Sequence, residues 1–429
     1  MDDPDWITGG APHVWRPYAQ MKTARPPLPV RATHGVRLVL EDGRELVDGI
    51  ASWWTACHGY NHPHIREAVT RQLERMPHVM FGGVAHEPAY RLAARLAALL
   101  PGELDHVFFA ESGSVSVEIA MKMALQYWLN RGVRGRTRFL AFRDGYHGDT
   151  LGAMSVCDPD DGMHALFKGA LAHQVIADLP TTPERADALD RTLAAHVHEI
   201  AAILVEPLVQ GAGGMRFHDG ETLRTLRRLA DRHGVLLIFD EIFTGFGRTG
   251  TLFAMEQAGV TPDIVTLSKA LTGGTLPLSC AVASRAVFDA FWSDDPSRAL
   301  MHGPTYMANP LACAAANASL DLFEDGERLK AVARISQGLY AGLDACREAP
   351  GVVDVRVMGA IGAVEFDRPL DAAALTDRFV DAGVFIRPMG RVIYLTPALI
   401  IEDADLERLT GAIVKVCRAG ADFGARSLD

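Results

Sequence analysis

The chain has 429 residues, which is more than one small core requires and predicts two or three domains, or one large domain with a smaller one attached. Hydrophobic residues make up 48% and charged residues 22%, the range of folded globular proteins, which excludes a disordered or fibrous chain. A formal net charge of −11 argues against a general nucleic-acid or anionic-membrane surface, because phosphates are bound by clustered Lys and Arg.

The N-terminal segment MDDPDWITGG is acidic and has neither the basic start nor the apolar stretch of a signal peptide. No apolar run approaches the ~18 residues of a membrane span. The 6 cysteines are scattered without a C-x-x-C pair, which is typical of reduced thiols. We therefore expect a cytoplasmic protein. Next along the chain, VRLVLEDGRELVDG (36–49) predicts a β-hairpin that turns at Asp42-Gly43.

Between about residues 100 and 285, short apolar runs alternate with helix-like segments, a pattern that predicts an α/β fold with a mostly parallel sheet covered by helices. The predicted strands are HVFFA (106–110), RFLAF (138–142), AAILV (201–205), VLLIF (235–239), DIVTL (263–267) and SCAVA (279–283). All but the last are followed by polar groups, in the order ESGS, RDGYHGD, EP, DE and SK. Ligands of open α/β sheets bind outside the carboxyl ends of the strands, so these polar groups predict a site there.

From about residue 310 the pattern changes to a smaller α+β arrangement. Helices are predicted at PLACAAANASLDLF (310–323), near 325–346, at AALTDRFVDAG (373–383) and at DLERLTGAIVKVCRAG (405–420), and strands at VFIRP (384–388) and RVIYLTP (391–397). We expect a large domain over 61–309 and a small domain made of 1–60 and 310–429.

The first candidate site feature is the Ser-Gly-Ser turn between the strand at 106–110 and a long helical segment. Backbone N–H groups at a helix start are unsatisfied, Gly113 permits close approach, and Ser112 or Ser114 can donate, which together suit an anion. An ordinary serine N-cap is the alternative explanation.

The second feature is Asp240, which ends a strand expected to be buried and so requires a cationic or hydrogen-bonding partner. The same stretch contains Gly245-x-Gly247-x-x-Gly250, the letters of a dinucleotide fingerprint, and a nicotinamide dehydrogenase is therefore an alternative class. The fingerprint should turn directly from a strand into a helix, whereas here a connecting stretch intervenes and the following helix is poor, so we interpret the glycines as a loop.

The third feature is Lys269, at the end of the next predicted strand, in TLSKALTGG (266–274). A lysine in a loop is usually solvated. Here it follows a buried strand that can neighbour the strand of Asp240, and an anion site ends a third strand. A lysine, a buried carboxylate and a phosphate site are the parts that bind pyridoxal phosphate (PLP): the lysine forms the Schiff base, and the carboxylate keeps the pyridine nitrogen protonated.

These motifs carry a resemblance to a known family. FDEIFTGFGRTG (239–250), DIVTLSKALTGG (263–274), FRDGYHGDT (142–150) and ESGSVSVEIAMK (111–122) resemble the fold-type-I, class III PLP-dependent aminotransferases over nearly the whole chain. Within that class, five further segments resemble the adenosylmethionine:8-amino-7-oxononanoate aminotransferases of biotin synthesis. They are VWRPYAQM (14–21), SWWTACHGYNHP (52–63), HVMFGG (78–83), GAMSVCDPDDGMH (152–164) and MHGPTYMANPLACAAANASL (301–320).

The resemblance implies how the cofactor is held. Lys269 is implied to bind PLP covalently and to act as acid and base, Asp240 to pair with the pyridinium nitrogen, and Tyr146 to stack on the ring. Gly113 and Ser114 are implied to take the phosphate. The family forms homodimers with shared active sites, in which Pro304 and Thr305 complete the phosphate site of the partner subunit.

The resemblance also implies a substrate pocket. Tyr18 and Trp53 are implied to line it, with Tyr18 catalytic and placed against adenine, while Tyr146, Lys269 and the backbone of Gly303 contact the substrate. Arg387 is implied to bind the substrate carboxylate, which its bidentate guanidinium suits. The implied substrates are S-adenosylmethionine and 8-amino-7-oxononanoate, and the implied product is 7,8-diaminononanoate.

Some alternatives stay open on the sequence. Another class III aminotransferase, using lysine as donor or acting on an ω-amine, a nicotinamide dehydrogenase and a non-catalytic PLP-binding protein all remain. The histidines of HGYNHPH (58–64) lack zinc-type spacing, so no metal site is expected. Glu206 and Arg248 receive no role, and Phe243 stands where many members of the family carry a smaller residue.

Overall fold

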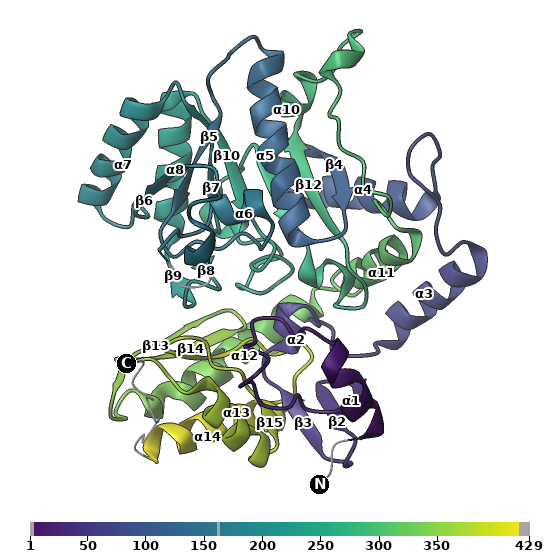
Figure 1. Cartoon of the computed structure of the whole chain (residues 1–429), viewed down its shortest axis with the longest axis vertical. Helices are drawn as coiled ribbons and strands as arrows, with labels where there is room; N and C mark the ends of the chain where they lie inside the picture. The colour runs from purple at the N-terminus through teal and green to yellow at the C-terminus, as the bar shows by residue number, and fades with distance from the viewer. Residues whose placement is uncertain (1–3, 161–163, 420–429) are drawn as a thin grey trace.

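The computed structural model describes residues 4–160 and 164–419. Residues 161–163 of the motif at 152–164, and Gly420 of the predicted closing helix, lie outside this range. The molecule has a larger part built on a central sheet and a smaller part beneath it (Figure 1). No helix among the described residues is both long and apolar enough to cross a membrane.

The larger part contains a seven-stranded sheet in the order β4-β12-β11-β10-β7-β5-β6. Its strands are β4 (Leu104–Ala110), β5 (Arg138–Phe142), β6 (Val175–Ala177), β7 (Ile200–Val205), β10 (Leu236–Asp240), β11 (Ile264–Leu267) and β12 (Ser279–Ser284). β12 is antiparallel to both neighbours, and the other neighbouring strands of this sheet are parallel. The predicted mostly parallel sheet is confirmed, and only the three-residue β6 was missed.

Helices cover both faces of this sheet because alternate strand residues point to opposite sides. On β10, Leu236 and Ile238 belong to a core shared with α5, whereas Leu237 and Phe239 belong to a second core that includes Leu226 of α8. The helices of the larger part are α3 (Pro63–Arg75), α4 (Glu87–Leu99), α5 (Gly113–Asn130), α6 (Leu151–Ser155), α7 (Pro183–His196), α8 (Gly220–His233), α9 (Met255–Ala258), α10 (Arg285–Asp289) and α11 (Pro310–Asp321).

The smaller part joins the two ends of the described chain. Its strands are β1 (Val30–His34), β2 (Arg37–Leu40), β3 (Glu45–Asp48), β13 (Val352–Met358), β14 (Ile361–Phe366), β15 (Val384–Phe385) and β16 (Val392–Leu395), and its helices are α1 (Asp5–Gly10), α2 (Ala51–Trp54), α12 (Glu327–Leu343), α13 (Ala372–Asp381) and α14 (Asp403–Arg418). β15 pairs in parallel with β3, so the N-terminal segment shares a sheet with the C-terminal region. The predicted hairpin is confirmed as β2 and β3, with Gly43 at φ 86° in its turn.

Two strands predicted in the smaller part are shorter in the structure. β16 spans Val392–Leu395 within the predicted 391–397, and β15 spans Val384–Phe385 within the predicted 384–388. β15 ends at Phe385, not at Pro388, and Pro388 has no N–H to donate to a neighbouring strand. Arg387 therefore lies in a loop beyond the strand.

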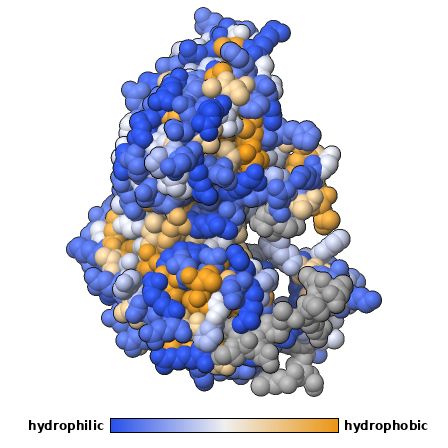
Figure 2. All heavy atoms as spheres, turned by 90° about the vertical axis from the view of Figure 1, so that its left-hand side faces the viewer, coloured by the Kyte–Doolittle hydropathy of each residue, from blue (hydrophilic) through white to orange (hydrophobic). Residues whose placement is uncertain are grey.

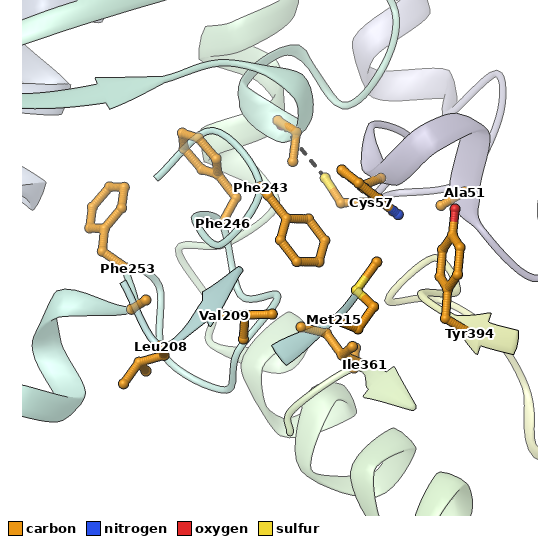
Figure 3. Close-up of a cluster of buried hydrophobic side chains, with 14 of the residues drawn as sticks. Ala51, Cys57, Leu208, Val209, Met215, Phe243, Phe246, Phe253, Ile361 and Tyr394 are labelled. Carbon is orange, nitrogen blue, oxygen red and sulfur yellow. Dashed lines mark hydrogen bonds between the residues drawn. The ribbon is translucent and has the colours of Figure 1, made fainter. Parts of the chain in front are cut away.

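The two parts are joined by a continuous hydrophobic core. In Figure 3, Phe243 lies among Cys57, Met215 and Tyr394, and these four residues come from four separate segments of the chain. On the surface, hydrophobic residues also gather where the two parts meet (Figure 2). The short antiparallel pair β8 (Val209–Gln210) and β9 (Arg216–Phe217) lies beside this junction.

Candidate active site

Two adjoining cavities lie at the carboxyl ends of the parallel strands. The larger, of about 870 Å³, is lined by residues of both parts, including Tyr18, Trp53 and Arg387. The smaller, of about 150 Å³, is lined by the β4–α5 turn and by Asp240. Lys269, Tyr146 and Trp54 line both. The structure thus brings together residues that the sequence places far apart.

Lys269 follows β11 and lies where the two cavities meet. Its backbone is left-handed, with φ 48°, which turns the chain out of the sheet. The ammonium nitrogen lies 4.8 Å from the centre of the Trp54 ring. Burial lowers the pKa of the Lys269 amine, while the charges of Asp240 and Glu206 act in the opposite direction. Losing a proton to form the neutral amine therefore costs less free energy than in a solvated lysine.

Asp240 is the last residue of β10 and is 3% exposed. Its Oδ2 lies 2.7 Å from Nδ1 of His147, and its Oδ1 accepts hydrogen bonds from the Ile242 N–H (3.1 Å) and the Thr266 hydroxyl (3.2 Å). Thr266 lies beside Asp240 because β10 and β11 pair in parallel at that register. The carboxylate has the hydrogen-bonding partners that its burial requires.

His147 is a site residue that the sequence interpretation missed. It is 3% exposed and lines the smaller cavity. The available signal was its position in the DGYHGD loop after β5, directly beside Tyr146. A histidine next to a site residue is common in loops, so only the contact with Asp240 across 93 positions reveals its part in the site.

The turn between β4 and α5 forms one wall of the smaller cavity. Ser112 is the N-cap of α5, its hydroxyl accepting from the Val115 N–H at 3.4 Å, so the capping alternative applies to this serine. Gly113 and Ser114 line the cavity. A Cβ on Gly148, which has φ 128°, would lie 2.1 Å from the Ser114 Oγ, so only glycine fits there.

The hydroxyl groups of Tyr18 and Tyr146 both donate hydrogen bonds to the carboxylate of Asp149. The Tyr18 hydroxyl donates to Asp149 Oδ2 at 2.5 Å and the Tyr146 hydroxyl to Oδ1 at 3.0 Å. The Asp149 N–H donates to Ser114 Oγ at 3.1 Å. Burial, together with the hydrogen bond to Asp149, raises the pKa of Tyr18, and burial raises the pKa of Tyr146. Both phenols therefore stay protonated. Asp149 is the second residue that the sequence interpretation missed.

Trp53 and Arg387 form the outer wall. The Arg387 guanidinium lies 4.7 Å from the centre of the Trp53 ring, and the Tyr18 and Trp53 rings meet edge to face at 6.0 Å. Within residues 4–160 and 164–419, no carboxylate forms an ion pair with Arg387. A cation on an aromatic face without a carboxylate partner is suited to an anionic ligand.

Gly303, Pro304 and Thr305 are not brought to these cavities. They lie in the loop before α11, where Gly303 and Thr305 are exposed, and none of the three lines either cavity in this chain. Their implied role in the partner subunit's site stays a prediction.

Residues left without a role are now placed. Glu206 is buried, and its oxygens accept from the Tyr146 N–H (3.0 Å) and the Gly211 N–H (2.9 Å); burial raises its pKa to about 7. Phe243 packs on Trp54 with ring centres 4.3 Å apart. Arg248 is buried away from both cavities and donates to the carbonyls of Ala360 and Pro397.

The histidines of residues 58–64 do not converge on a common point. His58 contacts Ser319 and Arg328, and His64 contacts Asp321. In the described part of the chain, no group of three or more metal-ligating side chains comes together.

The smaller cavity has the groups that PLP requires. The start of the 18-residue α5 suits a phosphate, the buried Asp240 carboxylate suits a protonated ring nitrogen, and the Lys269 amine suits an aldehyde. Trp54 lines both cavities, and the centre of its ring lies 4.8 Å from the Lys269 nitrogen. These residues therefore fit the cofactor. By contrast, Gly245–Gly250 form turns, and α9 has only 4 residues, so the dinucleotide geometry is absent from this described segment.

Comparisons with known proteins agree with this geometry. The family model for class-III aminotransferases matches residues 18–417. The adenosylmethionine-8-amino-7-oxononanoate aminotransferase of Mycobacterium leprae is 49% identical, covering 95% of each chain, and that of Corynebacterium glutamicum is 45% identical, covering 94% of this chain and 96% of that one.

Solved structures of transaminases are also similar. The adenosylmethionine-8-amino-7-oxononanoate aminotransferase of Methanocaldococcus jannaschii superposes with a TM-score of 0.92 at 30% identity, covering 97% of this chain and 98% of that one. A PLP-bound amine transaminase from an uncultivated Pseudomonas species superposes with a TM-score of 0.89 at 32% identity, covering 95% and 99%. The chain thus belongs to the class-III aminotransferases and is a transaminase that depends on pyridoxal phosphate.

Proposed function

We propose that this enzyme transfers the amino group of S-adenosylmethionine to 8-amino-7-oxononanoate, forming 7,8-diaminononanoate in biotin synthesis. The observation that carries the proposal is the outer wall of the larger cavity, where Tyr18, Trp53 and Arg387 meet. Relatives with 49% and 45% identity carry the name of that activity.

One pocket has to accept two unlike substrates in turn. Both carry a carboxylate, which Arg387 is placed to bind through two parallel hydrogen bonds. The aromatic faces of Tyr18 and Trp53 suit an adenine ring in one substrate and an aliphatic chain in the other. A cavity of about 870 Å³ is large enough for a ligand of this size.

We assign the cofactor to the smaller cavity. When bound, PLP acts as an electron sink and so makes the α-hydrogen of the substrate acidic. Lys269 holds the cofactor. Its Nζ also moves the proton, because burial lowers the pKa of the amine and so favours the neutral form that accepts a proton. Asp240, oriented by His147, keeps a proton on the ring nitrogen. Gly113 and Ser114 bind the phosphate, and Tyr146 covers the ring.

We further propose a cytoplasmic homodimer with shared active sites. Gly303, Pro304 and Thr305 line neither cavity of their own chain and are accessible to serve the partner subunit's site. We also propose residues 61–309 as the large domain and residues 1–60 with 310–429 as the small domain, with α11 (Pro310–Asp321) at the boundary, where it packs on α3 and α4 of the larger part.

A single-turnover experiment tests the donor. The PLP form of the enzyme is mixed with S-adenosylmethionine or with lysine, and conversion to the pyridoxamine form is followed by absorbance. We expect conversion by S-adenosylmethionine. Conversion by lysine alone would contradict the proposal and indicate a lysine-dependent enzyme. Conversion by simple ω-amines alone would indicate an amine transaminase, the activity named for the similar Pseudomonas structure.

A further inference from the structure

The segment Ala51–Trp54 is a turn of left-handed helix. Its residues have φ angles of 44°, 51°, 58° and 73°, all in the left-handed region. Hydrogen bonds from the Trp54 N–H to the Ile50 carbonyl and from the Thr55 N–H to the Ala51 carbonyl, both 2.9 Å, close the turn. Residues with a Cβ disfavour this conformation, so four in succession persist only when their surroundings hold them.

One buried carboxylate supplies that restraint. Asp48, at the end of β3, is 2% exposed. Its Oδ1 accepts from the Ile50 N–H at 2.9 Å, and its Oδ2 accepts from the Ser52 N–H at 2.8 Å and the Tyr60 hydroxyl at 2.5 Å. Burial raises the pKa of Asp48, and these hydrogen bonds oppose the shift.

The turn points its two indoles to the two cavities. Trp53 lies against Arg387 in the larger cavity, and Trp54 lies under Lys269 between them. The turn also packs on the loop that carries the lysine, since a Cβ on Gly274 (φ 76°) would lie 2.9 Å from the backbone of Thr55 and Ala56. The Cys57 thiol approaches the Ala270 carbonyl at 3.7 Å. A shift of the turn would therefore move both indoles relative to Lys269.

We propose that Asp48 is a positioning residue of the substrate pocket, holding the left-handed turn that sets Trp53 against Arg387 and Trp54 against Lys269. Asp48 lines neither cavity and acts only through the turn. The inference rests on the proposed use of this pocket, but not on which amino donor fills it.

The test uses Asp48→Asn, with the amino donor that the wild-type holoenzyme accepts in the single-turnover experiment. An amide cannot accept at both ends, so at least one hydrogen bond is lost. We expect KM for donor and acceptor to rise about tenfold, the effect of one hydrogen bond to a buried charged group. The near-ultraviolet circular dichroism of the cofactor-free protein should change as the indoles move.

Rescue by glycine separates positioning from folding. Ser52 is exposed and has φ 51°, so Ser52→Gly favours the turn without Asp48. Ser52→Gly alone should leave KM unchanged, and Ser52→Gly in the Asp48→Asn background should recover most of the lost affinity. Recovery of the thermal midpoint without recovery of KM would overturn the proposal, as would a wild-type KM in Asp48→Asn.

A milder variant keeps the proposal testable if Asp48→Asn does not fold. Tyr60→Phe removes one of the three donors to Asp48 and keeps the carboxylate. We expect a severalfold rise in KM for both substrates, and an unchanged KM would overturn the proposal. Failure of the wild-type enzyme to use S-adenosylmethionine would contradict the proposed function and leave this inference to be judged by the variants.

Discussion

Replacing Asp240 by Asn tests the electrostatic centre of the site. The substitution keeps the shape of the side chain and removes its charge. Asp240 accepts from His147, Ile242 and Thr266, all donors. With its oxygen toward Ile242 and Thr266, the new amide turns its NH2 group toward His147 Nδ1, which has to change tautomer to accept from it. The charge is lost in either orientation.

The structure sets the size of the expected effect. At 3% exposure, Asp240 has almost no solvent screening. Removing one partner of a buried charge pair costs about 3–5 kcal/mol. If that loss falls on the transition state, at about 1.4 kcal/mol per tenfold, the rate falls by about two to four decades. The proton on the ring nitrogen is the partner whose stabilisation is lost.

The assay is the single-turnover rate with the amino donor, and Thr266→Val is the matched control. The control removes one donor to the same carboxylate through a bond of 3.2 Å, worth about 1.5 kcal/mol at the low end for a hydrogen bond to a charged group, and keeps the charge. We expect the control to retain the rate within about tenfold. A rate for Asp240→Asn that also stays within tenfold of wild type would refute the reasoning.

Further predictions concern the lysine, a buried glutamate and the arginine. Borohydride reduction should attach the cofactor to the peptide that contains Lys269, and Lys269→Ala should abolish the attachment; mapping to another lysine by mass spectrometry would contradict this assignment. The folded pKa of Glu206 is raised to about 7, so the folded state binds a proton more tightly than the unfolded state. The free energy of unfolding of the cofactor-free enzyme should therefore fall as pH rises from about 4.3 to about 7. Glu206→Gln should flatten that dependence in urea unfolding, and an equal slope in both proteins would exclude the shift. Arg387→Leu should raise KM for both carboxylate substrates by one to two decades, because a charge-assisted hydrogen bond contributes about 1.5–3 kcal/mol. The thermal midpoint should not change. An unchanged KM would exclude Arg387 as the group that binds the substrate carboxylate.

Much of the fold was predictable because it depends on local signals. The strand runs ending at Ala110, Phe142, Val205, Phe239 and Leu267 are short, apolar and followed by polar residues, and each lies in a strand of the central sheet. Burial on both faces produces such runs whatever the neighbours are. The order of the strands, the antiparallel position of β12 and the short β6 depend on contacts between distant segments and were not encoded locally.

The site divides in the same way. Lys269 and Asp240 were identifiable because a charged residue at the end of a buried strand requires an explanation. His147 and Asp149 were missed because an acidic or histidine residue in a loop has no periodicity to mark it. Their significance arises only when folding brings His147 to Asp240 and places Asp149 between the hydroxyls of Tyr18 and Tyr146.

The sequence by itself determined the class of chemistry, since strand ends carrying Lys269, Asp240 and a Ser-Gly-Ser turn suffice to predict a PLP site. Only the tertiary structure decided how the pocket is built. The left-handed turn at residues 51–54 and its restraint by Asp48 have no signature in the letters ASWW, because φ is chosen by the hydrogen bonds and packing around the turn and not by the propensities of its residues.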